Sequence, residues 1–291
     1  MTPEIDPPFE LCAPLEILAP VVFNSPHSGR VYPASFLAAS RLDGLALRRS
    51  EDAYVDVLFA PFVELGMPLL KAHFPRAYVD VNREAYELDP GMFDGELPPG
   101  SNTNSVRVAG GLGTIPRIVA EAAEIYQGPL PAAEAGKRIE TLYQPYHQKL
   151  SETLQQVQTQ FGVALLIDCH SMPSATRSWR SPRPDFVLGD RFGTACAPHI
   201  VEIAQGALEA MGYSVVRNRP YAGGHITQTY GQPATQVHGL QIEINRGLYL
   251  QEDRISLSAG FGALRSAMTA FAAEMAQTMV RDPGRQADAA E

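Results

Sequence analysis

Residues 165–173 read LLIDCHSMP, an apolar run followed by an acid, a cysteine, a histidine and a turn. The pattern predicts a strand that enters the core and brings Asp168 and His170 to its carboxyl end. Ligand sites in open α/β sheets form at the carboxyl ends of strands, so these two residues either finish a strand or hold a ligand in a cleft. Partners elsewhere in the chain decide between the two interpretations.

The rest of the chain alternates short apolar runs with longer segments rich in Ala, Leu, Glu and Gln, which predicts strands interleaved with helices. Strands are expected at VVFNS (21–25), AYVDV (77–81), VALLID (163–168), DFVLG (185–189), YSVVR (213–217) and GLQIEI (239–244). Helices are expected over residues 51–65, 130–160, 194–211 and 256–280. This order predicts an α/β fold of three layers, α/β/α, with a mixed, largely parallel central sheet.

The domain organisation follows from the absence of any repeat or low-complexity linker in the sequence. We expect a single domain over residues 1–291, with its core at about 20–280 and a frayed C-terminal tail of about ten residues. Residues 84–114 are rich in Gly and Pro. A loop of about 30 residues is unusual in a compact domain, so we expect it to be a functional loop or lid.

The amino-acid composition excludes several classes of binding partner and indicates a cellular compartment. The 291-residue chain has 23 Lys plus Arg and 32 Asp plus Glu, a formal net charge of −9, which argues against a nucleic-acid or anionic-membrane surface. Its three cysteines are unclustered, which indicates a reducing compartment. The sequence lacks a secretory signal pattern and any apolar run near the roughly 20 residues of a membrane span. We therefore expect a cytoplasmic protein; its oligomeric state is not indicated.

Polar residues gather at four predicted strand ends. They are His27 in SPHSG (25–29), Asn82 and Arg83 in DVNRE (80–84), His170 in DCHSMP (168–173) and Glu243 in QIEINRG (241–247). Two histidines and a carboxylate base suit a zinc hydrolase, because catalytic zinc takes three protein ligands and keeps one position open. A single histidine is more often an ordinary hydrogen-bonded residue, whereas a carboxylate in an apolar strand needs a reason, since burying it unpaired is costly.

The third metal ligand is the open question. The usual His-x-x-Glu spacing fails, because the residue three places after His27 is Arg30. Ser50-Glu51-Asp52 precedes a predicted helix, where Ser50 suits an N-cap and the acids suit the positive end of the helix dipole. Asp52 therefore either belongs to that helix start or supplies the ligand, and Glu51 is its rival.

Seven segments, taken in their order and separation, resemble the N-formylglutamate amidohydrolase family, which is itself similar to zinc carboxypeptidases and aspartoacylases. The segments are NSPHSG, SEDAYVDVLF, FPRAYVDVNRE, DCHSMP, LGDRFGTAC, NRPYAGGHITQTYG and HGLQIEINRGLY. They cover residues 20 to 250, most of the chain. The resemblance implies a zinc-carboxypeptidase-like fold and an amidohydrolase with one Zn²⁺ per chain that cleaves N-formyl-L-glutamate to L-glutamate and formate.

The resemblance also implies the metal and catalytic residues. His27, Asp52 and His170 are the expected zinc ligands, Glu243 the general base and Arg76 the arginine that stabilises the oxyanion. This chemistry suits a formyl amide, a poor electrophile, because zinc lowers the pKa of its bound water and polarises the formyl oxygen. A nearby carboxylate then takes the proton of the water and passes it to the leaving amine.

Four further residues are expected to contact a small anionic acyl-amino-acid substrate. Asn82 and Arg83 resemble the clamp for a substrate carboxylate, and Arg219 and Gly224 lie in the RPYAGG loop, which in this family closes over the substrate. Guanidinium groups match carboxylates bidentately, so an acidic protein needs only a local cluster of positive charge. Asp168 is expected to orient the ring of His170 or to accept its free N–H, as metal-bound histidines require.

Other interpretations compete with this one. The same scaffold would serve another zinc amidohydrolase or carboxypeptidase acting on a different N-acyl amino acid or peptide. A catalytically inactive small-molecule-binding relative is disfavoured, because Glu243 and the arginines are present. A Cys169–His170 nucleophile is disfavoured too, because adjacent strand residues point to opposite faces. The sequence assigns no role to three other histidines, namely His147, His225 and His238.

Overall fold

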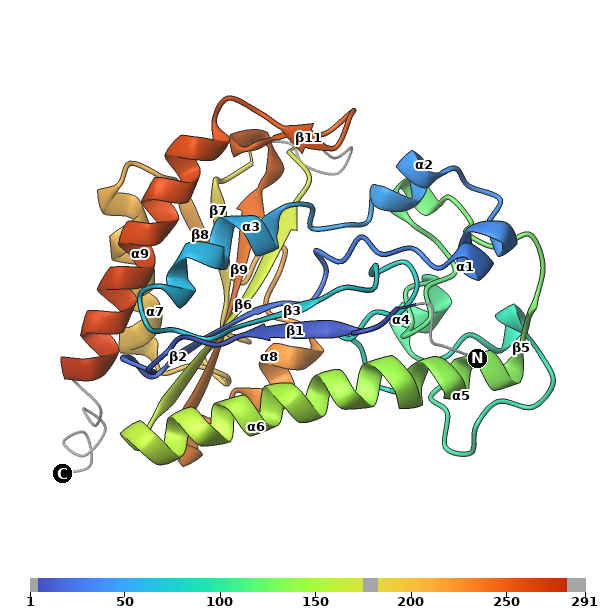
Figure 1. Ribbon diagram of the computed structural model, residues 1–291, viewed down its shortest axis with the longest axis horizontal. Helices are drawn as coiled ribbons and strands as arrows, with labels where there is room; N and C mark the ends of the chain where they lie inside the picture. Colours follow the sequence, from blue (N-terminus) through green and yellow to red (C-terminus); the bar gives the residue numbers. More distant parts are fainter. Residues whose placement is uncertain (1–4, 175–182, 282–291) are drawn as a thin grey trace.

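A mixed seven-stranded sheet in the order β1-β3-β2-β6-β9-β7-β8 lies at the centre of the computed structural model, which describes residues 5–174 and 183–281 (Figure 1). Its strands are β1 (Phe9–Cys12), β2 (Val21–Ser25), β3 (Leu69–Ala72), β6 (Ala164–Met172), β7 (Phe186–Gly189), β8 (Val215–Arg217) and β9 (Val237–Asn245). β1 runs antiparallel to β3 and β7 antiparallel to β9, whereas the other neighbours are parallel. The prediction of a mixed, largely parallel sheet is confirmed.

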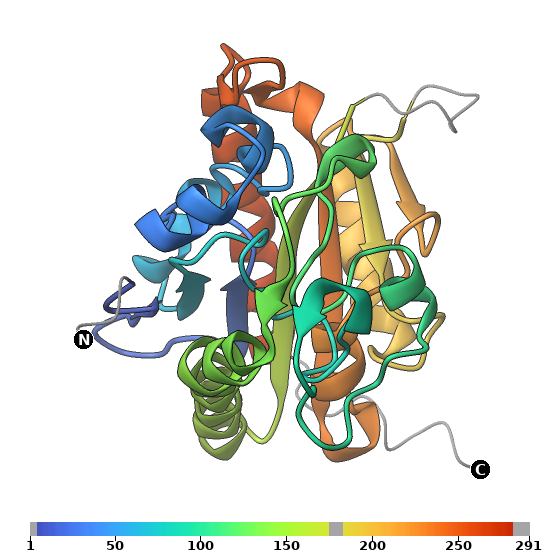
Figure 2. The ribbon, with the colours of Figure 1, turned by 90° about the vertical axis from the view of Figure 1, so that its right-hand side faces the viewer.

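Helices cover both faces of the sheet, as the three-layer prediction requires (Figure 2). One face carries α3 (Val55–Phe59), α7 (Pro198–Ala210) and α9 (Phe261–Arg281), and the other carries α6 (Gln144–Phe161) and α8 (His225–Tyr230). Along β6, Leu165 and Ile167 pack into the first layer, while Ala164 and Leu166 pack into the second. A strand buried on both faces reads as a continuous apolar run, which explains why this sequence does not alternate.

Smaller elements complete the described chain. They are α1 (Ala34–Ala39), α2 (Gly44–Arg48), α4 (Val106–Ala109), α5 (Ala132–Arg138), the strand pairs β4 (Phe93–Asp94) with β5 (Leu130–Pro131) and β10 (Leu250–Gln251) with β11 (Ser256–Leu257), a π-helical turn (Ile139–Tyr143), and short 3₁₀ turns at Ala60–Val63, Pro90–Met92, Ala120–Ala122, Pro233–Thr235 and Arg246–Leu248. No helix in the described ranges has both the length and the hydropathy that a bilayer crossing requires. The expected frayed tail lies outside the described residues.

Five of the six expected strands are present, and one is wrong. β6 runs on to Met172, so His170 lies within the strand instead of just past its end. AYVDV (77–81) is a turn, in which the amides of Tyr78 and Val79 donate to the carbonyl of Pro75. The segment is apolar because Val79 is buried in the core beneath the second helical layer, not because it pairs with a neighbouring strand. The edge strand β1 and its neighbour β3 were not predicted.

The expected helices at 130–160, 194–211 and 256–280 are confirmed as α5 with α6, as α7 and as α9. The helix expected at 51–65 is shorter, because α3 begins only at Val55 and ends at Phe59, before a 3₁₀ turn. Its N-cap residue is Tyr54, and the Ser50 hydroxyl instead donates to the carbonyl of Leu47. The N-cap role considered for Ser50 is therefore wrong, and residues 50–52 are free of helical constraint.

Candidate active site

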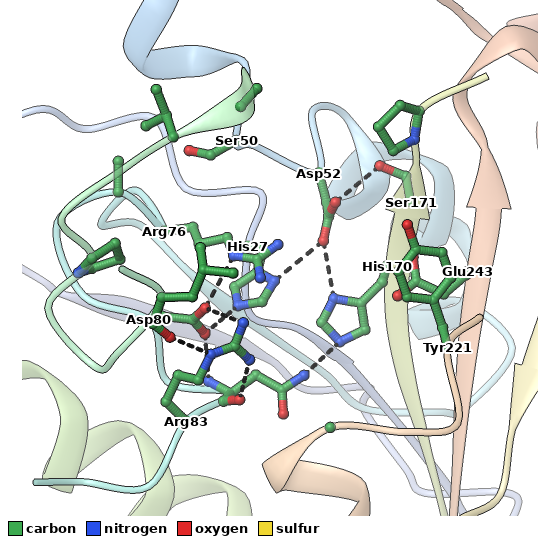
Figure 3. Close-up of a pocket in the computed structure, with 18 of the residues that line it drawn as sticks. His27, Ser50, Asp52, Arg76, Asp80, Arg83, His170, Ser171, Tyr221 and Glu243 are labelled. Carbon is green, nitrogen blue, oxygen red and sulfur yellow. Dashed lines mark hydrogen bonds and ion pairs between the residues drawn. The ribbon is translucent and has the colours of Figure 1, made fainter. Parts of the chain in front are cut away.

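A cavity of about 580 Å³ opens beside the carboxyl ends of β2, β6 and β9 (Figure 3). All but one of the predicted site residues line it, namely His27, Asp52, Arg76, Asn82, Arg83, His170, Gly224 and Glu243. Arg219 is exposed and is not among the residues that line the cavity. The expectation that residues from four separate chain segments share one cleft is confirmed.

Three of these residues form a buried group that suits a metal ion. Ligand atoms of His27, Asp52 and His170 lie within 4.8 Å of one another. Oδ2 of Asp52 lies 3.0 Å from Nδ1 of His170 and 3.3 Å from Nδ1 of His27. Two ligands at tetrahedral positions around zinc lie about 3.4 Å apart. Nδ1 of His27 is buried and accepts no hydrogen bond from the described residues, so the donor set fits a zinc ion.

Each imidazole is held from behind by a carboxylate. Nε2 of His170 lies 2.9 Å from Oδ2 of Asp168, and Nε2 of His27 lies 2.8 Å from Oδ1 of Asp80. When both Nε2–H groups donate to these carboxylates, both Nδ1 lone pairs point at the same position, as a metal site requires. The contact of Asp168 agrees with the prediction. Asp80 was missed, although it stands in the quoted DVNRE segment, two residues before Asn82.

Asp52, and not Glu51, lies beside the histidines. Its Oδ1 accepts from the Ser171 hydroxyl at 3.0 Å and from Nη2 of Arg246 at 3.2 Å, which leaves Oδ2 for the metal position. Burial alone would raise the pKa of this carboxyl, but the adjacent His170 and His27 hold the pKa well below its usual value. Glu51 points away, and its carboxylate accepts from the Tyr32 hydroxyl at 2.7 Å.

Glu243 is a buried carboxylate at the edge of this group. It pairs in register with His170 on the neighbouring strand, and its flanking residues Ile242 and Ile244 pack into the core on the opposite side. Burial raises the pKa of Glu243 to about 7, and Nε2 of Gln241 donates to Oε1 at 2.9 Å. Among the described residues Glu243 forms no ion pair, because the nearby Arg246 is bound to Asp52 instead.

Two arginines reach the cavity from the turn that follows β3. Nε of Arg76 donates to Oδ2 of Asp80 at 3.0 Å, and no described residue accepts from its terminal nitrogens. Arg83 is more firmly held: Nε donates to the Leu112 carbonyl and Nη1 to the Asn82 carbonyl, each at 2.8 Å. Burial lowers the pKa of Arg83 to about 10, so it stays charged at neutral pH.

Asn82 connects the metal group to the loop that precedes α8. Its Nδ2 lies 3.2 Å from Nε2 of His170, and its Oδ1 accepts from the Ile226 amide at 2.8 Å. The amide of Gly224 donates to Oε1 of Gln241 at 2.8 Å. A Cβ at Gly224 would lie 2.4 Å from the Asn82 side chain, so this position admits only glycine without movement.

Two of the remaining histidines, His147 and His238, and the cysteine Cys169 make structural contacts. Nε2 of His147 lies 2.8 Å from the Val81 carbonyl, and Nδ1 of His238 accepts from the Ala197 amide at the start of α7. Burial lowers the pKa of both rings to about 4, so they are neutral at pH 7. Cys169 packs in the core, and burial raises the pKa of its thiol, which argues against a nucleophilic role.

Comparison with known proteins places the chain among formyl-amino-acid hydrolases. The sequence model of the N-formylglutamate amidohydrolase family matches residues 19–250. The N-formylglutamate deformylase of Pseudomonas putida is 32% identical over 241 residues, 80% of this chain and 82% of the relative. That of Pseudomonas aeruginosa is 31% identical over 238 residues, 80% of this chain and 83% of the relative.

Solved structures agree with the sequence matches. The crystal structure of N-formylglutamate amidohydrolase from Ralstonia eutropha JMP134 is 36% identical, with a TM-score of 0.89 over 95% of this chain and 99% of that one. A gene product of Agrobacterium tumefaciens is 17% identical, with a TM-score of 0.64 over 93% of this chain and 95% of the other. The second likeness is one of fold alone.

Proposed function

The chain belongs to the N-formylglutamate amidohydrolase family, and on that premise we propose that it hydrolyses N-formyl-L-glutamate to L-glutamate and formate with one bound zinc ion. The observation that carries the proposal is the buried group of His27, Asp52 and His170 directly beside Glu243. The three ligand atoms suit zinc, and a carboxylate with a pKa of about 7 suits proton transfer at neutral pH.

The three ligands would hold zinc, which when bound makes water more acidic and polarises the formyl oxygen. Glu243 would take a proton from the attacking water through the carboxylate oxygen that Gln241 leaves free, and then deliver it to the amine nitrogen of glutamate. Arg76 would use its free terminal nitrogens to stabilise the negative charge that develops on the formyl oxygen. These roles need no movement of the metal ligands.

Substrate binding is proposed for the arginine cluster at the other side of the cavity. Arg83 is buried, charged and fixed by two carbonyl groups, so its remaining N–H groups are oriented in advance for a substrate carboxylate. Asn82 would act mainly by fixing Asp168 and the start of α8, because its Nδ2 donates to Oδ2 of Asp168 and its Oδ1 accepts from the Ile226 amide. Gly224 would let that loop approach closely enough to cover the substrate.

The direct test is formate release from N-formyl-L-glutamate, with the purified protein assayed as isolated, after chelation, and after zinc is restored. We expect activity to follow zinc content at one ion per chain. The competing assignment, another N-acyl amino acid as the substrate, predicts faster turnover of the acetyl or succinyl analogue than of the formyl compound. A zinc-loaded protein that releases no formate would refute the proposal. We also propose that the protein is cytoplasmic, that it acts in histidine degradation, and that residues 1–291 form a single domain.

A further inference from the structure

The cavity contains more positive charge than its own carboxylates neutralise. Five arginines line it, namely Arg49, Arg76, Arg83, Arg107 and Arg246, against three carboxylates, Asp52, Asp80 and Glu243. The whole chain has a formal net charge of −9, so the excess of two positive charges among the lining residues is local. Like charges gathered in a cleft favour an anionic ligand.

Two arginines of this cluster have no described ion pair, the exposed Arg49 and the half-buried Arg107. Arg76 and Arg83 share Asp80, at 3.0 and 3.4 Å, and Arg246 is bound to Asp52. The guanidinium of Arg107 forms no ion pair or hydrogen bond with any residue in the described ranges, although it lines the cavity and is half-buried. The repulsion between Arg107 and the other arginines of the cavity is therefore not offset by an ion pair of Arg107 with any described residue.

The segment around Arg107 is hydrogen-bonded to the segment that contains Arg83. Arg107 lies in α4, whose N-cap Ser105 accepts from the Val108 amide at 3.0 Å. Leu112 accepts from Nε of Arg83 at 2.8 Å, and the carbonyl of Thr114 accepts from the Asp80 amide at 2.8 Å. These hydrogen bonds hold the backbone of the loop that contains Arg107 next to the segment of Arg83.

Arg83 and Arg107 line the same cavity from segments that are joined by the bond between Arg83 and the Leu112 carbonyl. Burial is the largest cause of the lowered pKa of Arg83, and the positive charge of Arg107 contributes to it. The two carboxyl carbons of glutamate are joined by four single bonds of about 1.5 Å, which limits their separation to about 5 Å. Two arginines that line one cavity can each bind one carboxylate of such a ligand, and Leu112 and Ile118 add apolar lining for the two methylenes.

We propose that Arg107 binds the side-chain carboxylate of the substrate while Arg83 binds the α-carboxylate, so that Arg107 determines the preference for acidic N-formyl amino acids. The inference rests on the proposed function. It replaces Arg219, which is exposed and outside the cavity lining, with a residue of the 84–114 loop. It also gives that loop a role, because its α4 turn would supply the selectivity of the site.

The test is the ratio of kcat/KM for N-formyl-L-glutamate to that for N-formyl-L-glutamine, which has the same shape without the charge. A hydrogen bond between charged groups contributes about ten- to a hundred-fold, so Arg107→Gln should lower this ratio by about that factor. Arg107→Glu should lower it further. Arg49→Gln is the matched control, because Arg49 also lines the cavity without a described ion pair but is exposed and comes from the segment before Asp52.

Equal losses on both substrates in Arg107→Gln would overturn the inference, as would a larger drop in the ratio for Arg49→Gln than for Arg107→Gln. A ratio in Arg107→Glu that equals that of the wild type would also overturn it. The proposed function fails separately, since it requires the wild-type protein to release formate at all. Formate release with an unchanged ratio in the Arg107 variants would leave the function intact and remove only this assignment.

Discussion

Glu243→Gln separates the catalytic role of this carboxylate from its effect on stability. The amide has the same shape, and its oxygen can still accept the hydrogen bond that Gln241 donates at 2.9 Å to Oε1. It cannot take up a proton from water. We therefore expect kcat to fall by about 10²–10⁴-fold while the zinc content stays at that of the wild type.

Although Glu243→Gln should lower kcat, it should raise the free energy of unfolding of the metal-free protein. The pKa of Glu243 rises from its usual 4.5 to about 7, mainly because the side chain is buried. Below pH 4.5 both folded and unfolded chains carry the proton, and the ionisation costs nothing. Between pH 4.5 and 7 the unfolded chain loses the proton first, so the free energy of unfolding falls by about 3 kcal/mol and stays lower above pH 7. The Gln variant has no such titration.

The assay is urea unfolding of chelated wild type and Glu243→Gln at pH 5 and pH 8, beside kcat and zinc content of the loaded proteins. We expect the variant to gain about 2–3 kcal/mol relative to the wild type between the two pH values. Comparing the two proteins at each pH cancels the titrating groups that do not interact with Glu243. Near-full activity of the Gln variant would refute the base assignment, and a difference that does not depend on pH would refute the burial argument.

Three further predictions concern the metal, the substrate and the general base. His170→Ala should abolish zinc binding. Asp52→Ala should lower the zinc content per folded chain, measured by mass spectrometry, more than Glu51→Ala does. The reverse ranking would make Glu51 the ligand. Arg83→Ala should raise KM for N-formyl-L-glutamate strongly with little rescue by Lys, which loses the planar fork; an unchanged KM would contradict the clamp. Gln241→Glu should lower kcat about tenfold or more with zinc retained, since it removes the donor to the base and adds a like charge; wild-type kcat would dismiss this contact.

The strand-end rule accounts for most of the site that was predicted from sequence. Polar residues after β2, within β6 and within β9 were expected to meet because parallel strands place their carboxyl ends at one edge. The register of β6 and β9, with His170 opposite Glu243, is consistent with that expectation. The period of a buried strand does not give the strand's length, which is why the end of β6 was placed too early.

What the sequence did not yield depends on contacts between distant segments. AYVDV has the composition of a strand, but Pro75 before it turns the chain, and its valines are buried without strand partners. Asp80 is recognisable only from its 2.8 Å contact with His27, because an acid two residues before an Asn-Arg pair has no characteristic spacing. Arg107 was not predicted, because the sequence around it is typical of an exposed loop and does not indicate that it lies beside Arg83.

The third ligand shows how tertiary contacts replace a missing local motif. A His-x-x-Glu pair would fix both ligands on one short segment, whereas here Asp52 is 25 residues beyond His27 in the sequence. The Asp52 amide donates to the His27 carbonyl at 3.0 Å, which joins the two segments directly. Arg246, just after β9, donates to the Glu51 carbonyl and to Oδ1 of Asp52, and the Ser171 hydroxyl on β6 donates to the same oxygen. The orientation of Asp52 is thus set by the ends of the two strands that carry His170 and Glu243. Arg246 is held by Asp52 in this way, so Glu243 has no ion pair among the described residues, and burial keeps its pKa high.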